Sequence, residues 1–255
     1  MTISWKSWLL PIWLAGAAVA AAQTPDCPCP TTPPPPPIWF GKVDFSFLST
    51  SGNTDTTSIG GALELNYNPK PWLFTLKAAY LHASSNGETT AESFVAGLKA
   101  ARDLTDHVDV FVSGGYLQNK FSGIQNLFNF DGGAGYKLLN TPSQFLRVEG
   151  AFGYTTEQDI IASVVVPYRN YANVRGALAY KWQLTKSAAF TNDFAYLMDL
   201  SNTANWFITE KAAITVDISK IFALQASWTL LFRNQPVIGF GKTDTATAVA
   251  LVGKF

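Results

Sequence analysis

The sequence is poor in charge, cysteine and histidine, and each shortage narrows the class of protein. Charged residues make up 14% of the 255 residues, whereas soluble domains carry about 25%. Basic and acidic residues number 18 each, so the charge balance does not favour a nucleic-acid partner. A chain with so little charge would be poorly solvated if its whole surface faced water.

The few cysteines and histidines are badly placed for a metal centre. A single residue separates Cys27 from Cys29, whereas two residues separate the cysteines of a redox or zinc pair. His82 and His107, the two histidines, lie far from them in the sequence. We therefore expect no metal site and no cofactor. A surface or intermolecular disulfide, or lipid anchoring at Cys27, stays open.

The first 38 residues predict export rather than a folded unit. Lys6 precedes an apolar stretch from Trp8 to Ala21, and the small residues Ala20-Ala21-Ala22 lie at the end of this stretch. The pattern is typical of a cleaved signal peptide over 1–22. The stretch is shorter than the roughly 20 apolar residues of a membrane anchor. Residues 23–38 contain five consecutive prolines, which predicts an extended periplasmic tail.

From Trp39 to Phe255 the sequence has neither an 18-residue apolar run nor a sustained helical period. Apolar residues instead alternate with polar or small ones, as in Lys42 to Phe47, a pattern that places successive side chains on opposite faces of a strand. The alternation and the turn residues between segments predict twelve strands. Their expected ranges are 39–49, 56–67, 72–84, 90–103, 108–121, 127–138, 145–157, 170–182, 188–200, 206–218, 222–233 and 245–255.

The two faces of these strands differ in chemistry. In the segment 170–182, Leu178 and Trp182 share one face, and Arg175 and Lys181 share the other. Aromatic residues gather at both ends of the apolar face, as in the two girdles of a membrane barrel. One girdle contains Tyr67, Trp72, Tyr136 and Trp182 near the turns, and the other contains Tyr80, Tyr116, Tyr154, Tyr196 and Trp206 near the loops.

Alternation alone also fits a soluble sandwich or lipocalin-like barrel, whose apolar face points inward. Long strands, two aromatic girdles and a terminal Phe255 on an alternating strand favour the membrane. The prediction is an all-β fold, a closed transmembrane antiparallel up-and-down β-barrel over 39–255 in the outer membrane of a Gram-negative cell. Its expected partners are outer-membrane lipids, lipopolysaccharide and the barrel assembly machinery, with no nucleic acid, and we expect a monomer.

The connections predict which end of the barrel faces outward. Short turns such as 68–71, 104–107, 139–144, 183–187 and 219–221 alternate with loops near Ser51, at 85–89, 159–167 and 234–244. Bacterial barrels keep short turns in the periplasm and longer loops outside. The loop ends are therefore expected at the cell surface.

Three segments carry a family resemblance. They are SGNTDTTS from Ser51, NGETTAESF from Asn86 and the long stretch KFSGIQNLFNFDGGAGYKLLNTPSQFLRVEGAFGY from Lys120. In this order and spacing they resemble the DUF481 family, described as salt-induced outer membrane proteins of the YdiY type. The resemblance covers the whole predicted barrel and implies an outer-membrane location. It carries over no catalytic residues.

The polar face of the strands supplies the candidate lining of the lumen. Positive residues on it are Lys42, Lys77, Lys99, Lys137, Arg147, Arg175, Lys181, Lys211 and Arg233; negative ones are Asp44, Glu64, Asp109, Asp131, Glu149, Asp193 and Asp217. A selective channel is expected to show a ring of one sign, and this set is close to balanced. It fits a lumen packed with ion pairs or a narrow, weakly selective path.

A lipid-modifying enzyme of the phospholipase kind is the rival function. His82 is predicted to face outward, and a hairpin about Asn86-Gly87 would bring it beside Glu92, which could orient a general base. The candidate nucleophile Ser58 is predicted to face inward, however, and His107 falls in a periplasmic turn. We expect no catalytic residue and no enzyme. The predicted role is structural, stress-related or one of minor permeability.

Overall fold

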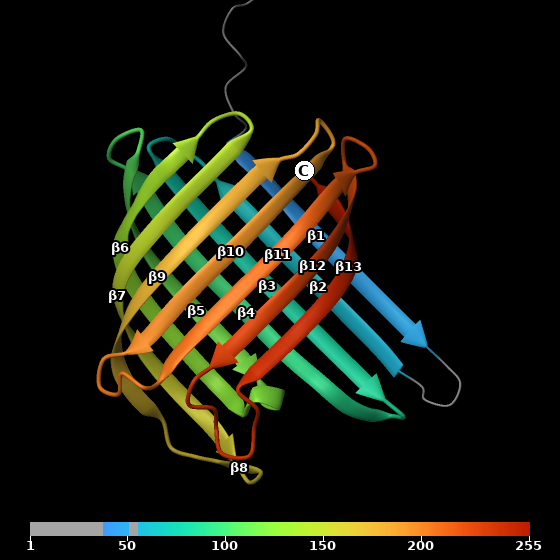
Figure 1. The fold of residues 1–255 in the computed structure, drawn as a ribbon, viewed down its shortest axis with the longest axis vertical. Helices are drawn as coiled ribbons and strands as arrows, with labels where there is room; N and C mark the ends of the chain where they lie inside the picture. Colours follow the sequence, from blue (N-terminus) through green and yellow to red (C-terminus); the bar gives the residue numbers. More distant parts are fainter. Residues whose placement is uncertain (1–37, 51–55) are drawn as a thin grey trace, which may run out of the picture. The chain divides into compact units, whose positions relative to one another are not determined.

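The computed structural model describes residues 38–50 and 56–255, which form an all-β unit (Figure 1). The predicted signal peptide, the tail up to Pro37, and Cys27 and Cys29 lie outside the described residues. The described part of the chain contains no helix that is long and apolar enough to cross a membrane.

Twelve long strands form the wall, and their bounds lie within a few residues of those predicted. They are β1 (Trp39–Thr50), β2 (Thr56–Tyr67), β3 (Trp72–Ser85), β4 (Glu88–Asp103), β5 (Val108–Asn119), β6 (Ile124–Asn140), β7 (Gln144–Ile161), β9 (Arg169–Gln183), β10 (Ala188–Asp199), β11 (Trp206–Asp217), β12 (Phe222–Arg233) and β13 (Thr243–Lys254). A short helical turn, η1 (Lys120–Ser122), joins β5 to β6.

Each long strand pairs antiparallel with its two neighbours, and the ring closes where β1 meets β13. The predicted closed barrel of twelve strands is therefore confirmed. The expected loop at 159–167 is wrong in part, because β7 continues to Ile161 and pairs with a two-residue strand, β8 (Val164–Val165). Ala162 and Ser163 join them with positive φ angles, as a tight hairpin turn requires.

The hairpin between β3 and β4 forms where the sequence predicts it. Asn86 and Gly87 have φ angles of 50° and 81°, which is the geometry that favours Asn-Gly in two-residue β-turns. The turn pairs Ser85 with Glu88, and a register shift between Ser84 and Ala83 then places His82 opposite Glu92 on the neighbouring strand.

Contacts between strands that are not neighbours identify the inner face of the barrel. Lys99 on β4 contacts Glu149 on β7 at 2.5 Å, although β5 and β6 lie between these strands in the sheet. Such a contact can form only across the interior. The register then carries the assignment from strand to strand, and every predicted lumenal residue lies on the inner face.

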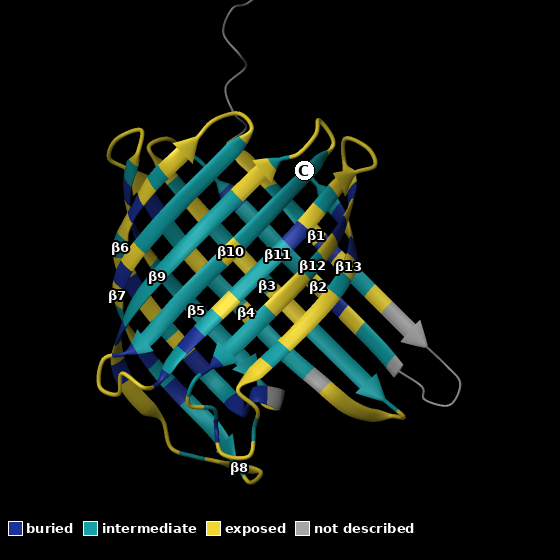
Figure 2. Ribbon diagram, in the orientation of Figure 1, coloured by how far each residue is buried: buried dark blue, intermediate teal, exposed yellow. Residues whose placement is uncertain are grey.

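The outer face carries the aromatic residues at both ends of the strands, and exposed and buried positions alternate along several strands (Figure 2). At the turn end, the Trp39 and Tyr67 rings stack with centroids 4.3 Å apart. At the loop end, Trp206 packs between Tyr196 and Phe232. Both predicted girdles lie on this outer face.

The seam between β1 and β13 is paired over only part of its length. Register pairs join Lys42–Phe45 to Leu251–Lys254, and Gly41 exchanges backbone hydrogen bonds with Phe255. Beyond Phe45 the two strands separate toward the loop end (Figure 1). Within the described residues, 46–50 of β1 and 243–250 of β13 have no register partner across this seam.

An epitope tag inserted at Asn86 should be reached by antibody on intact cells, whereas one inserted at Asn140 should be reached only after the outer membrane is permeabilised. Asn86 lies in the β3–β4 hairpin, and Asn140 ends β6 at the opposite end of the barrel. The reverse pattern of labelling would contradict the assigned orientation. Asn53, in the other loop expected to be accessible, lies outside the described residues.

Candidate functional site

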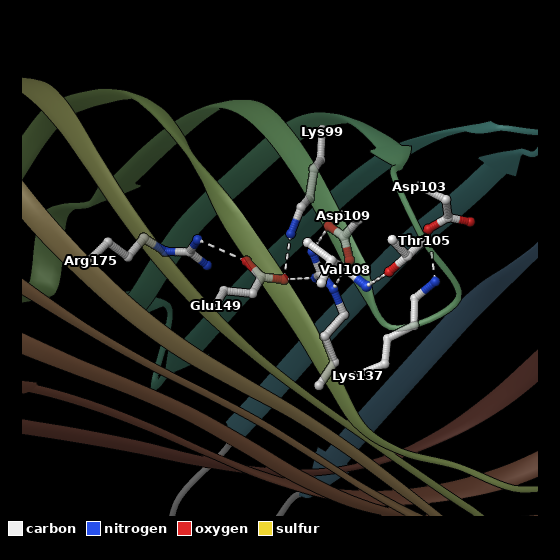
Figure 3. A network of polar contacts seen from close by, with 9 residues as sticks. Lys99, Asp103, Thr105, Val108, Asp109, Lys137, Glu149 and Arg175 are labelled. Carbon is white, nitrogen blue, oxygen red and sulfur yellow. Dashed lines mark hydrogen bonds and ion pairs between the residues drawn. The ribbon is translucent and has the colours of Figure 1, made fainter.

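The candidate site is the lumen, and its turn-end half holds a cluster of ion pairs. Arg147 donates through Nε to Asp109 at 2.8 Å and also contacts Glu149. Glu149 in turn pairs with Lys99 at 2.5 Å and with Arg175 at 3.5 Å. Figure 3 shows Lys99 and Arg175 reaching the Glu149 carboxylate, with Asp109 nearby. The cluster therefore joins the walls formed by β4, β5, β7 and β9.

An aromatic ring packs against this cluster, and the intervening strand β6 carries a buried carboxylate. The ammonium of Lys99 lies 3.9 Å from the centroid of the Phe111 ring, a favourable cation–π distance. Asp131, 1% exposed, accepts a hydrogen bond from Asn129 at 2.7 Å. Because buried charges are tolerated only when paired and hydrogen-bonded, this wall of the lumen is packed rather than open.

A second ionic cluster lies at the loop end, and the sequence analysis found only one member, Arg233. Glu157, which is 1% exposed, contacts Arg233 and Arg169 at 2.6 Å each and accepts a hydrogen bond from Tyr171 at 3.1 Å. Asp159 lies 3.7 Å from Arg233. The cluster ties β12 to β7 and β9 across the interior.

Apolar side chains and a loop close the same end. Ile124, Leu127 and Phe207 form a buried cluster between β6 and β11. The loop 234–242 between β12 and β13 reaches the β5–β6 connection, where a Cβ on Gly123 would lie 2.7 Å from the Phe240 ring and 2.8 Å from Val237. A hydrogen bond from Ser122 to Asp244 links the β5–β6 connection to the first residues of β13, directly after the loop. We call residues 234–242 and 120–123 the mouth plug.

The wall formed by β1–β3 and β10–β13 is more open. Lys77, Asp193 and Thr229 face the lumen on β3, β10 and β12, yet all three are exposed. Lys77 and Lys42 share Glu64, at 3.8 and 3.9 Å. The lumen therefore has packed parts and water-accessible parts, and the exposed Lys77, Asp193 and Thr229 lie in the accessible part.

The comparisons with known proteins agree with this geometry. The family model described as a protein of unknown function, DUF481, matches residues 43–255. The chain belongs to the DUF481 family. An Escherichia coli (strain K12) relative, the uncharacterized protein YdiY, is 25% identical over 212 residues, which cover 83% of this chain and 81% of the relative. The predicted family is thus confirmed.

A solved porin structure has a fold similar to that of this DUF481 protein. The NanC porin has a TM-score of 0.50 at 10% identity, over 84% of this chain and 98% of that one. The COG4313 outer membrane channel from Pseudomonas putida F1 has a TM-score of 0.48 at 12% identity, over 85% and 95% of the two chains. At these identities the likeness concerns the fold alone.

The rival catalytic arrangement is brought together only in part in this DUF481 barrel. His82 and Glu92 are register partners on the outer face, as the sequence predicts. The Glu92 carboxylate pairs with Lys120 at 2.8 Å, and Ser58 lies on the inner face opposite Ala83. A nucleophile and a base on opposite faces of the wall cannot act on one substrate atom.

The other histidine, His107, adds no further catalytic or metal-binding candidate. His107 is exposed in the β4–β5 turn, where its Nδ1 lies 3.2 Å from the carbonyl oxygen of Lys137. Among the described residues, no group of three or more His, Cys, Asp or Glu side chains is placed to hold a metal ion. The structure thus assigns His107 a local contact with the backbone of β6.

Two sets of residues escaped the sequence analysis. Glu157 shares strand parity with Glu149, so alternation could have placed it in the lumen, whereas Asp159 lies where a loop was expected. Glu210 breaks the rule that charge lies inside, because it faces outward on β11 and accepts a hydrogen bond from Asn192 at 2.8 Å. A cross-strand amide partner of this kind gives no signal in the local sequence.

Proposed function

We propose that this DUF481 barrel provides minor permeability through a narrow, water-filled path along the open side of its lumen. The observation that carries the proposal is the exposure of Lys77, Asp193 and Thr229, which face inward. Side chains on the inside of a filled barrel would be covered by one another. Their accessibility supports a lumen that holds water beside the packed wall.

The path is narrow because two features occupy the rest of the lumen. The Arg147 and Glu149 cluster fills the turn-end part of the side formed by β4–β9, and the mouth plug covers part of the loop end. Small solutes and ions fit such a route, whereas large ones do not. The NanC structure is described as a porin, and that likeness of fold is compatible with the proposal but does not carry it.

Weak ion selectivity follows from the charges. Lumenal cations and anions alternate around the open side. Lys42, Glu64 and Lys77, for example, are register partners on the neighbouring strands β1, β2 and β3. Neighbouring charges of opposite sign cancel much of the field that would select an ion, whereas selective filters use rings of one sign. We therefore expect a small preference between K⁺ and Cl⁻.

The cellular setting of the proposal is the outer membrane. We infer export by a signal peptide over 1–22, cleavage before Gln23, and insertion by the barrel assembly machinery as a monomer. Outer-membrane lipids and lipopolysaccharide would then surround the aromatic girdles. A stress-related role, such as the response to salt suggested by the family resemblance, is compatible with a small controlled leak.

Loosening the mouth plug should raise the conductance of the barrel in planar bilayers. Val237→Ser with Phe240→Ser removes the side chains that rest against Gly123, so the discrete channel steps should become larger. Ile238→Ser is the matched control, because Ile238 lies in the same loop and is 76% exposed, against 5% for Val237.

The conductance of the unmodified protein and of the control should be equal. Larger channel steps in the Ile238→Ser variant would show that the packing of Val237 and Phe240 against Gly123 is not what limits the conductance. Silence in both the unmodified protein and the Val237→Ser, Phe240→Ser variant, with each folded in the bilayer, would contradict the proposed pore.

A further inference from the structure

The unpaired part of the β1–β13 seam needs a physical explanation. Over residues 46–50 and 243–250 the described parts of the two strands present their edges to each other without register pairs. Hydrocarbon cannot satisfy free backbone N–H and C=O groups, so irregular backbone at membrane depth is tolerated only where it lines protein or water. An opening that is wetted from the lumen fits this requirement.

The outer surface beside the seam is polar for a membrane barrel. The β13 side chains on that face are Thr243, Thr245 and Thr247, all exposed, before Val249 and Leu251 resume the apolar pattern. The three threonines occupy the same part of β13 that lacks a partner on β1. Their hydroxyl groups can hydrogen-bond to exposed backbone groups or to water, so the edge is suited to contact with more than lipid chains.

Inside the opening the lumen is lined by small and apolar residues. Ser46, Gly60 and Leu81 lie on one hydrogen-bonded row across β1, β2 and β3. Leu81 continues into an inward-facing patch with Val95 on β4 and Leu117 on β5. Val95 is 44% exposed although it faces the lumen. On the other side of the seam the inner face of β13 carries Ala246, Ala248 and Ala250, with Asp244, bonded to Ser122, at its loop end.

A positive charge lies at the deep end of this patch. Lys77 stands two and four residues from Ala79 and Leu81 on the same face of β3. Its side chain is 56% exposed, against 28% for its partner Glu64. Lys42 lies near both Glu64 and Asp44, at 3.9 and 4.0 Å, whereas Lys77 has Glu64 alone among the ion pairs of the described residues. The lining therefore changes from apolar to charged along the lumen, and the Lys77 ammonium is its more exposed cation.

We propose that the seam between β1 and β13 is a lateral entrance through which single-chain amphipathic anions, of the fatty-acid class, pass from the lipid into the lumen. The hydrocarbon chain lies against Leu81, Val95 and Leu117, and the anionic head group reaches Lys77. The mouth plug narrows the axial route at the same end, whereas the seam opens sideways. The inference rests on the proposed function only in treating the lumen as accessible.

The test locks the seam with a disulfide and asks whether a lipid probe still reaches the inner patch. If pairing continued past Phe45 and Leu251, Ser46 would oppose Ala250, so Ser46→Cys with Ala250→Cys is the locking pair. Ala213→Cys with Ser227→Cys is the matched control, because these inward residues are already paired between β11 and β12. Both pairs are made in a full chain carrying Cys27→Ser and Cys29→Ser.

The probe is a fatty acid that carries a diazirine on its chain, photoactivated in lipid vesicles that contain the refolded protein. Labelling of the inward-facing Leu81 and Val95 is expected in the parent chain and in the oxidised control. It should be lost in the oxidised locking pair and return on reduction. Persistent labelling of these residues in the oxidised locking pair, or its absence from the parent, would overturn the lateral entrance.

Two further measurements keep the test decisive if the locking disulfide does not form. Lys77→Gln should reduce labelling by the fatty acid to that by the matching fatty alcohol, whereas Lys181→Gln, which alters an exposed lumenal lysine on β9, should not. Equal loss in both variants would contradict a head-group site at Lys77. Disulfide-linked dimers of a Ser46→Cys variant would assign the free edges to a second copy of the chain and overturn the entrance.

Conductance separates this inference from the proposed function. Channel steps that persist in the oxidised locking pair, together with lost labelling, support both. Labelled Leu81 and Val95 in a protein without channel steps would support the entrance and refute the pore. Channel steps without labelling of the patch would refute the entrance alone.

Discussion

Replacing Glu157 with alanine should lower the free energy of unfolding of the refolded barrel by about 3–5 kcal/mol, because removing one partner of a buried ion pair leaves uncompensated charge. Glu157 lies between Arg169 and Arg233 and accepts a hydrogen bond from Tyr171. Without it, two guanidinium groups share one site with only Asp159 and Asp199 nearby. Denaturant unfolding in detergent or in vesicles measures the loss.

Two variants make the Glu157 result specific. Glu157→Gln keeps the shape of the side chain and an oxygen that can accept from Tyr171, so its loss should be smaller. Asp217→Ala breaks the ion pair between Asp217 and Lys254, whose side chains are 38% and 37% exposed, respectively. Exposed pairs contribute at most about 1 kcal/mol to stability. Similar losses for Glu157→Ala and Asp217→Ala would refute a special role for the loop-end cluster.

Leu178→Arg should destabilise the barrel in lipid vesicles by roughly 2–4 kcal/mol, the cost of an arginine on the lipid face near the bilayer middle. Leu178 lies on the outer face of β9, with Phe194 and Val148 as its register partners. Lys181→Arg is the control, because Lys181 faces the lumen and is exposed there. A conservative change in water should leave the unfolding midpoint unchanged.

The structure sharpens the meaning of the Leu178 experiment. From the sequence alone, a soluble barrel with an apolar core would also lose stability on Leu178→Arg. Because Leu178 lies on the outer face, a barrel surrounded by water would instead tolerate the arginine. A neutral Leu178→Arg variant would therefore contradict the membrane location. A carbene probe dissolved in the lipid should in addition label position 178 and not position 181.

Strand number, strand bounds and the direction of most side chains were predictable because alternation is a local property. In 170–182, for example, Arg175 and Lys181 alternate with Leu178 and Trp182, and one assignment of faces fits the entire segment. The Asn86-Gly87 turn was predictable for the same reason, since positive φ angles select these residues. What alternation cannot say is which face lies inside, and the contact of Lys99 with Glu149 across the barrel decides that.

The site residues that sequence reasoning missed depend on contacts between distant segments. Val237 and Phe240 look like ordinary loop residues until their loop meets Gly123, more than a hundred positions earlier. Leu81 and Val95 are apolar residues on the inner face, and their relation to the unpaired seam becomes visible only in the closed barrel. Neither the packing of this loop nor the patch beside the seam produces a repeating pattern within the sequence of one strand.

The loop 234–242 also has a mechanical consequence for the shape of the cross-section. The β12–β13 connection and the β5–β6 connection arise from opposite sides of the ring, and the Ser122–Asp244 contact ties them together. A ring of fixed perimeter that is drawn in along one diameter must bulge elsewhere or part at its weakest joint. β13, which follows the tied loop, is the strand that leaves β1. The cross-barrel contact and the unpaired part of the seam thus meet on one strand, β13.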